Sequence, residues 1–181
     1  MVHRLTYPAA VLDRAKSVRL LSLDVDGVLT DGRLYYVGGD VEAKAFNTQD
    51  GAALKMLEST GVAIAIITGR RSAAVERRAA ELGIVHLFQG ADDKAACLAD
   101  LCRSTGLEAG AVAHVGDDVP DLPLFNRVGF RVSVPDAHPV VLARADYVTT
   151  AAAGNGAVRE VCHLIMTAQG TWQRALARYD R

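Results

Sequence analysis

The residues best suited to chemistry stand where an apolar stretch of the sequence meets two acids. Residues 18–23 are mostly apolar, and Asp24 and Asp26 follow them with one residue between. Side chains alternate along an extended chain, so both carboxylates can face the same way, and Gly27 allows a sharp turn after them. Such a pair could bind a hard cation and a phosphate, or serve as acid and base. A turn with two solvated acids is the alternative that the pair alone leaves open.

Polar residues also end two later apolar stretches. Residues 62–67 run into Thr68, Gly69 and Arg70, and residues 111–115 run into Gly116, Asp117 and Asp118. The Thr68 hydroxyl, the Gly69 amide at a helix start and the ammonium of Lys94 are donors suited to phosphate oxygens. Taken singly, each has an ordinary explanation, such as a helix cap for the acidic pair or a surface position for the lysine.

The elements that position these residues alternate between strand and helix. Strands are predicted at 18–24, 62–67, 84–88, 111–115 and 128–134, with a short sixth at 147–148, and helices at 8–16, 51–60, 72–82, 92–104 and 157–169. Short links between them indicate an α/β fold, a doubly wound parallel sheet with helices on both faces. Ligands bind such sheets beyond the carboxyl ends of the strands, where the polar residues above are expected to meet.

One insertion and one tail complete the predicted single domain, whose core spans about 18–169. Residues 33–48 read as a β-hairpin turning at Gly38-Gly39-Asp40, and its aromatic residues favour an oligomer interface. Asp50 is predicted to cap the following helix. His86 and His114 are expected to be core or supporting residues rather than ligands. Residues 170–181 are interpreted as a frayed tail or a contact with a neighbouring subunit, without chemistry.

Composition excludes several classes of function. The 181 residues carry a formal net charge of −1, with 50% hydrophobic and 23% charged residues, as in an ordinary globular protein. No basic stripe indicates nucleic-acid binding, and no long apolar run indicates a signal peptide or a membrane span. The three cysteines lack metal-ligand spacing and read as reduced. We therefore expect a cytoplasmic protein that binds neither nucleic acid nor membrane.

The chemistry that fits the whole set is hydrolysis of a phosphate ester. Asp24, Asp26 and Asp117 cannot gather in one pocket without a counter-ion, and oxygen ligands favour Mg²⁺. A carboxylate beside Mg²⁺ can attack phosphorus and form an aspartyl-phosphate. The acid two residues later can protonate the leaving alkoxide and then take a proton from the hydrolytic water.

In their order along the chain, these motifs resemble the four motifs of the haloacid dehalogenase superfamily. The narrower resemblance is to the small 3-deoxy-D-manno-octulosonate 8-phosphate (KDO 8-phosphate) phosphatases, which lack a large cap domain. It rests on residues 44–51, 66–70, 86–90, 145–149 and 156–162, and it covers roughly residues 18–169.

The resemblance implies a role for each matching residue. Asp24 is the nucleophile and Asp26 the acid and base, with its backbone carbonyl on Mg²⁺, while Asp117 completes the metal ligands. The other implied roles are phosphate binding by Thr68, Gly69 and Lys94, support of the metal loop by Asp118 and Asp121, and binding of the sugar-acid carboxylate by Arg78, with Arg70 as a second candidate.

The resemblance also implies a homotetramer whose hairpins form a central barrel. Active sites would lie between subunits, and a neighbour's glycine-rich segment would cover the small sugar-acid phosphate substrate. That segment usually carries adjacent glycines, but here it reads Ala153-Gly154-Asn155-Gly156. The change restricts the loop slightly and affects the lid on which substrate preference depends.

Three other functions stay open. A phosphatase for a nine-carbon keto acid, of the KDN 9-phosphate type, needs the same chemistry with a longer reach. A signalling receiver domain also uses Asp, Thr, Lys and Mg²⁺, but Asp26 supplies an acid that such a domain should lack. A non-catalytic phosphatase-like module is disfavoured by the complete set of catalytic residues.

Overall fold

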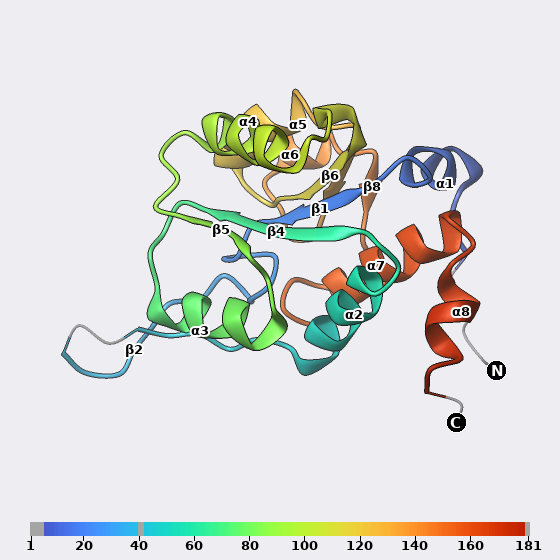
Figure 1. Ribbon diagram of the computed structural model, residues 1–181. Coiled ribbons are helices and arrows are strands. Elements are labelled where there is room, and N and C mark those ends of the chain that lie inside the picture. The colour runs from blue at the N-terminus through green and yellow to red at the C-terminus, as the bar shows by residue number, and fades with distance from the viewer. Residues whose placement is uncertain (1–5, 40–41, 180–181) are drawn as a thin grey trace.

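Six parallel strands form the centre of the molecule (Figure 1). The computed structural model describes residues 6–39 and 42–179, so Asp40 of the predicted hairpin turn lies outside it. The order across the sheet is β5-β4-β1-β6-β7-β8, with β1 in the middle paired to β4 and β6. The strands are β1 Leu20–Leu23, β4 Ala63–Thr68, β5 His86–Gln89, β6 Val112–Val115, β7 Phe130–Ser133 and β8 Tyr147–Val148. The predicted doubly wound sheet is confirmed.

Helices cover both faces of this sheet. One layer holds α4 (Lys94–Thr105), α5 (Leu122–Phe125) and α6 (Pro139–Leu142), and the other holds α2 (Thr48–Glu58), α3 (Ala73–Leu82) and α7 (Ala157–Ala168). All four residues of β1 are buried, and its side chains enter two different hydrophobic clusters, Leu20 in one and Leu21 and Leu23 in the other. A strand covered on both faces has to be apolar along its length, as the sequence is here.

The start of α2 differs from the prediction, and so does the role of Asp50. The Asn47 side chain accepts hydrogen bonds from the amides of Gln49 and Asp50, so the helix begins at Thr48. The Asp50 carboxylate is buried and accepts from the amides of Arg159 at 2.7 Å and Gly156 at 3.4 Å. Asp50 therefore caps the amino end of α7, a helix more than a hundred residues away in sequence.

The interpretation of residues 170–181 as a frayed tail is wrong for the part that is described. Trp172–Leu176 form helix α8, and the Trp172 ring packs edge-on against His163 with centroids 4.5 Å apart. Ala175 is buried. The remaining short helices are α1 (Ala9–Ala15), η1 (Ala109–Ala111) and η2 (Val119–Asp121). Among the helices described, none combines the length and the apolar character that crossing a membrane requires.

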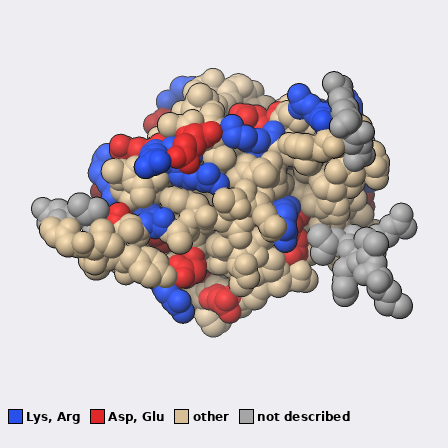
Figure 2. Space-filling model, turned by 90° about the horizontal axis from the view of Figure 1, so that it is seen from below, with Lys and Arg blue, Asp and Glu red and all other residues tan. Residues whose placement is uncertain are grey.

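The predicted hairpin is present as two short antiparallel strands, β2 (Tyr35–Tyr36) and β3 (Glu42–Ala43). It projects from the body of the molecule (Figures 1 and 2). The side chains on its first strand and turn are solvent-exposed, with Tyr36 at 70% and Val37 at 65%. Within the described residues this hairpin is the insertion between β1 and α2, and no large second domain accompanies the sheet.

Candidate active site

A tight turn after β1 places the first aspartate at the sheet edge. The Asp24 amide donates to the Val115 carbonyl at 3.0 Å, which continues the pairing of β1 with β6. The Val25 carbonyl accepts from the amides of Val28, Leu29 and Thr30, and this closes the turn. Because β1 ends at Leu23, strand alternation does not extend through the turn, and the side chains of Asp24 and Asp26 contact different partners.

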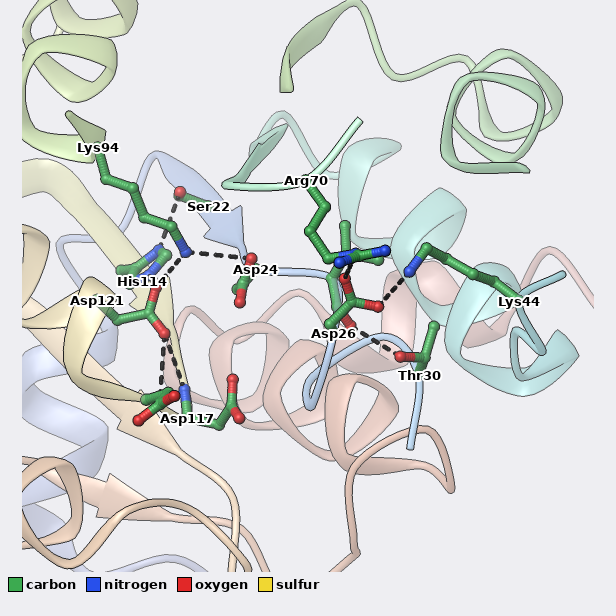
Figure 3. Close-up of polar contacts among 12 residues, drawn as sticks. Ser22, Asp24, Asp26, Thr30, Lys44, Arg70, Lys94, His114, Asp117 and Asp121 are labelled. Atoms are coloured by element: carbon green, nitrogen blue, oxygen red, sulfur yellow. Dashed lines mark hydrogen bonds and ion pairs between the residues drawn. The ribbon is translucent and has the colours of Figure 1, made fainter. Parts of the chain in front are cut away.

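Asp24 is buried beside one ammonium group (Figure 3). Lys94, the first residue of α4, places its Nζ 3.1 Å from Asp24 Oδ1 and 2.6 Å from Asp121 Oδ1. Burial and the nearby charge of Asp121 raise the pKa of Asp24, against the opposing effect of Lys94. The two carboxylates outweigh the burial of Lys94 and raise its pKa, so the ammonium stays charged.

Asp121 organises the loop that follows β6. Its Oδ2 accepts from the amides of Asp117 at 3.0 Å and Asp118 at 3.3 Å, and its Oδ1 lies 3.2 Å from His114 Nε2. Burial alone would raise the pKa of Asp121, but the hydrogen bond with His114 and the charge of Lys94 hold it well below its usual range. Asp118 also caps η2. Both acids therefore form hydrogen bonds with the backbone of the loop that follows β6.

One carboxylate oxygen of Asp117 has no hydrogen-bond partner among the described residues. This oxygen, Oδ1, is buried. Burial and the charges of Asp24, Asp121 and Asp118 raise the pKa of Asp117 to about 7. Gly27, at φ 89°, makes room for this carboxylate, because a Cβ there would lie 2.1 Å from Asp117 Oδ2. An uncompensated buried carboxylate is costly unless a cation balances it.

The donor set fits a hard divalent cation. Carboxylate oxygens of Asp24, Asp117 and Asp121 all lie within 4.8 Å of one another. Asp121 already accepts four contacts from Lys94, His114 and two amides, whereas Asp117 Oδ1 has none. Asp24 and Asp117 are therefore the side chains free to hold Mg²⁺, and oxygen-only ligands suit that ion.

The side chain of Asp26 lies in a second group of charges (Figure 3). Lys44 forms an ion pair with Asp26 Oδ1, and Arg70 Nε lies 3.7 Å from Asp26 Oδ2. Both cations also contact Glu42 of β3. No sequence pattern assigned Lys44 or Glu42 to the site, although Lys44 is the first residue of one of the matching segments. A lysine on a predicted hairpin is expected to be exposed, so the sequence gives no indication that Lys44 is buried.

The other residues predicted for the site fall into two sets. Thr68 ends β4, is buried and precedes Gly69, so both stand at the same sheet edge as Asp24. Arg78 instead contacts the Asn47 carbonyl at 3.3 Å and Glu81 at 3.4 Å, and its guanidinium lies 5.9 Å from the Phe46 ring centroid. Arg78 thus packs between α3 and α2, and among the described residues it forms no ion pair or hydrogen bond with the carboxylates of the site.

A cavity of about 330 Å³ opens beside Asp117. Ala152 and Ala153 of the glycine-rich segment line it together with Gly27, Asp31 and Asp136 among others. Gly154, at φ 63°, donates to the Val28 carbonyl at 3.0 Å, and a Cβ there would lie 2.7 Å from backbone atoms of Thr30 and Asp31. The chain's own glycine-rich segment therefore borders its own site.

This arrangement of a parallel sheet, paired acids and a lysine defines a class of hydrolase. Residues 83–161 match the family model described as haloacid dehalogenase-like hydrolase. A 3-deoxy-D-manno-octulosonate 8-phosphate phosphatase of Salmonella typhi is 48% identical over 165 residues, covering 91% of this chain and 88% of that protein. The corresponding phosphatase of Escherichia coli K12 is 47% identical over 92% of this chain and 89% of its own.

A solved structure agrees with these relatives. The 3-deoxy-D-manno-octulosonate 8-phosphate phosphatase of Moraxella catarrhalis, in complex with a magnesium ion, a phosphate ion and KDO, superposes with a TM-score of 0.92 at 45% identity. The match covers 96% of this chain and 99% of the other. The chain belongs to the family of 3-deoxy-D-manno-octulosonate 8-phosphate phosphatases among the haloacid dehalogenase-like hydrolases.

Proposed function

We propose that the protein hydrolyses KDO 8-phosphate to KDO and inorganic phosphate, a step in the synthesis of lipopolysaccharide precursors. The observation that carries the proposal is the buried Asp24 carboxylate, which lies beside Lys94 and near Asp117, whose Oδ1 has no hydrogen-bond partner among the described residues. The identity to phosphatases of that name supports the choice of substrate. A nine-carbon acid of the KDN 9-phosphate type is the competing substrate.

In the proposed reaction Asp24 is the nucleophile and Asp26 is the acid and base. An Asp24 oxygen attacks phosphorus, the bond from phosphorus to the sugar oxygen breaks, and Asp26 gives that oxygen a proton. Asp26 then takes a proton from water, the water oxygen attacks the aspartyl-phosphate, and phosphate leaves with Asp24 restored. Mg²⁺ held by Asp24, Asp117 and the Asp26 backbone carbonyl would offset the negative charge that gathers around the phosphoryl group.

The remaining roles concern binding. Thr68, Gly69 and Lys94 would hold phosphate oxygens, while Asp118 and Asp121 would keep the metal loop in place. Arg78 and Arg70 are the two candidates for binding the substrate carboxylate. Arg70 lies nearer to the acids of the site, with its Nε 3.7 Å from Asp26 Oδ2, whereas Arg78 contacts the Asn47 carbonyl.

The decisive experiment measures phosphate release from a panel of sugar-acid phosphates with Mg²⁺. KDO 8-phosphate should give the highest kcat/KM, EDTA should abolish turnover, and Asp24→Asn should lower kcat by ~10³-fold or more because the nucleophile is lost. Asp100→Asn, which alters an exposed acid on α4, is the matched control and should keep full activity. Absence of phosphate release from every sugar phosphate would refute the function, and a preference for KDN 9-phosphate would refute the substrate.

We further propose a cytoplasmic homotetramer that assembles through the hairpins. The hairpin exposes Leu34, Tyr35, Tyr36 and Val37 together on a projection from the body. Clustered apolar side chains of this kind mark interaction surfaces. Sites near the hairpin bases would then lie close to subunit boundaries.

A further inference from the structure

Lys44 stands out among the residues that the proposed reaction leaves without a role. It follows β3 at the base of the hairpin, yet its side chain is only 1% exposed. Its Nζ forms ion pairs with Asp26 Oδ1 and with Glu42 Oε1, the latter at 2.9 Å. A buried ammonium loses its hydration, so it is stable only where carboxylates replace the water.

These contacts form a closed ring of four charges. Arg70 pairs with Glu42 Oε2 and lies 3.7 Å from Asp26 Oδ2, so each carboxylate contacts both cations. The ring joins the turn after β1, the hairpin and the end of β4. Its two cations differ in burial, because the Arg70 side chain is 46% exposed whereas Lys44 is enclosed. Removal of Lys44 would therefore leave the buried side of Asp26 and Glu42 without a cation.

The position of the ring determines where the Asp26 carboxylate points. Figure 3 shows Asp26 reaching toward Lys44 and Arg70, while Lys94 contacts Asp24 and Asp121 on the other side. Asp26 Oδ2 is buried and has no hydrogen-bond partner in the described residues, so only charge and packing orient it. The hydrogen bond from Lys44 is the only one that the Asp26 side chain accepts from the described residues, so its loss would leave the rotation of this short side chain less restrained.

We propose that Lys44 is a positioning residue that orients Asp26 for proton transfer to the leaving oxygen of the substrate and pairs with the Asp26 carboxylate between that step and the transfer of a proton from water. This inference rests on the proposed function and adds a dependence of the acid step on the hairpin. The ammonium of Lys44 pairs with the carboxylates of Asp26 and Glu42. We therefore expect Lys44 to act through Asp26 and not by contacting the substrate. The hairpin thereby serves the catalytic centre of its own chain as well as any interface.

The acidity of the leaving group separates this role from a merely structural one. A sugar alkoxide leaves only when it is protonated, whereas p-nitrophenolate is stable enough to leave without a proton. General acid catalysis contributes ~10²–10⁴-fold where it is needed. A misplaced Asp26 should therefore slow formation of the aspartyl-phosphate from KDO 8-phosphate and spare its formation from p-nitrophenyl phosphate.

The experiment follows formation of the aspartyl-phosphate by rapid quench in the Mg²⁺-loaded protein, with both substrates. Lys44→Met should lower the rate constant with KDO 8-phosphate by ~10²-fold and change the p-nitrophenyl phosphate burst by less than about threefold. Lys44→Arg should restore part of the loss. Lys16→Met, which breaks an exposed lysine–aspartate pair far from Asp26, should match the unmodified protein.

A double-mutant cycle gives the second measurement. Asp26→Asn should reproduce the substrate-selective loss, and Lys44→Met should add little to it if the lysine acts only through Asp26. Lys44→Gln replaces Lys44→Met if the latter does not fold. Equal losses with both substrates, additive losses in the cycle, or a change confined to KM would overturn the inference. An unmodified protein that forms no aspartyl-phosphate from either substrate would instead overturn the proposed function.

Discussion

At the scale of single residues, the site depends on a glycine as much as on its acids. Gly27 follows Asp26, adopts φ 89° and passes within van der Waals contact of Asp117. A side chain would be strained in that conformation and would also displace the carboxylate that is free to bind a metal. The two effects can be separated, because Gly61 has φ 99° with open space around it.

We therefore expect Gly27→Ala to weaken Mg²⁺ binding by ~10-fold or more, with a parallel loss of activity at limiting Mg²⁺. Gly61→Ala should cost ~1 kcal/mol of stability from the left-handed conformation alone and leave Mg²⁺ affinity unchanged. Titration of Mg²⁺ by calorimetry, with denaturant unfolding alongside, checks both. Equal Mg²⁺ affinity in the two variants would show that the close approach to Asp117 does not matter.

At the scale of elements, α7 is fixed at its amino end by two buried acids. Asp50 caps it, and Glu160 ties its first turn to the segment after β8. Glu160 accepts from the Tyr147 hydroxyl at 2.6 Å, the Thr150 amide at 2.9 Å and hydroxyl at 2.7 Å, and the Ala151 amide at 3.0 Å. Burial opposes its charge, but the hydrogen bonds from Tyr147 and Thr150 prevail and lower the pKa of Glu160.

Glu160→Gln should lower the free energy of unfolding at neutral pH by ~2 kcal/mol, since a neutral amide satisfies fewer of these donors. A lowered pKa in the folded state stabilises the protein above the unfolded value of 4.5 and loses that effect as the pH falls through the folded value. The difference between variant and unmodified protein should accordingly shrink below about pH 4.5. Urea unfolding at several pH values measures this difference in the free energy of unfolding. Glu58→Gln, which alters an exposed acid, is the control. A difference that does not change with pH would contradict the role of the Glu160 charge.

At the scale of the whole molecule, the first strand and turn of the hairpin are the part that the body leaves uncovered. The strands of the hairpin have two residues each, and an isolated hairpin of that size is marginal in water. The proposed assembly would bury the exposed Tyr36 and Val37 and support the base of the hairpin, where Lys44 contacts Asp26.

A charge on the exposed face of the hairpin should therefore break the assembly. We expect Tyr36→Asp to shift sedimentation from a tetramer toward smaller species at micromolar concentration, because a carboxylate is costly to bury. Val85→Asp alters the most exposed large apolar side chain of the body and should leave the assembly intact. A monomeric unmodified protein would contradict the proposal directly.

Much of this architecture could be predicted because it depends on local patterns. The apolar runs predicted all six strands to within two residues at each end, and their alternation with helices predicted that the strands are parallel. Asp24, Thr68 and Asp117 fall where strand ends place them. Contacts set by distant segments could not be predicted, and the partners of Asp50 and Trp172 were therefore misjudged.

By itself, the sequence determined the sheet, the edge at which the polar residues gather and the acids available for phosphate chemistry, since strand periodicity and residue type are local properties. Only the tertiary structure decided that Asp121 is saturated by four contacts while Asp117 keeps an oxygen free, and that Lys44 rather than Arg78 reaches an acid of the site. The reason is physical: burial and ion pairing depend on which segments meet in space, and no single stretch of sequence carries that information.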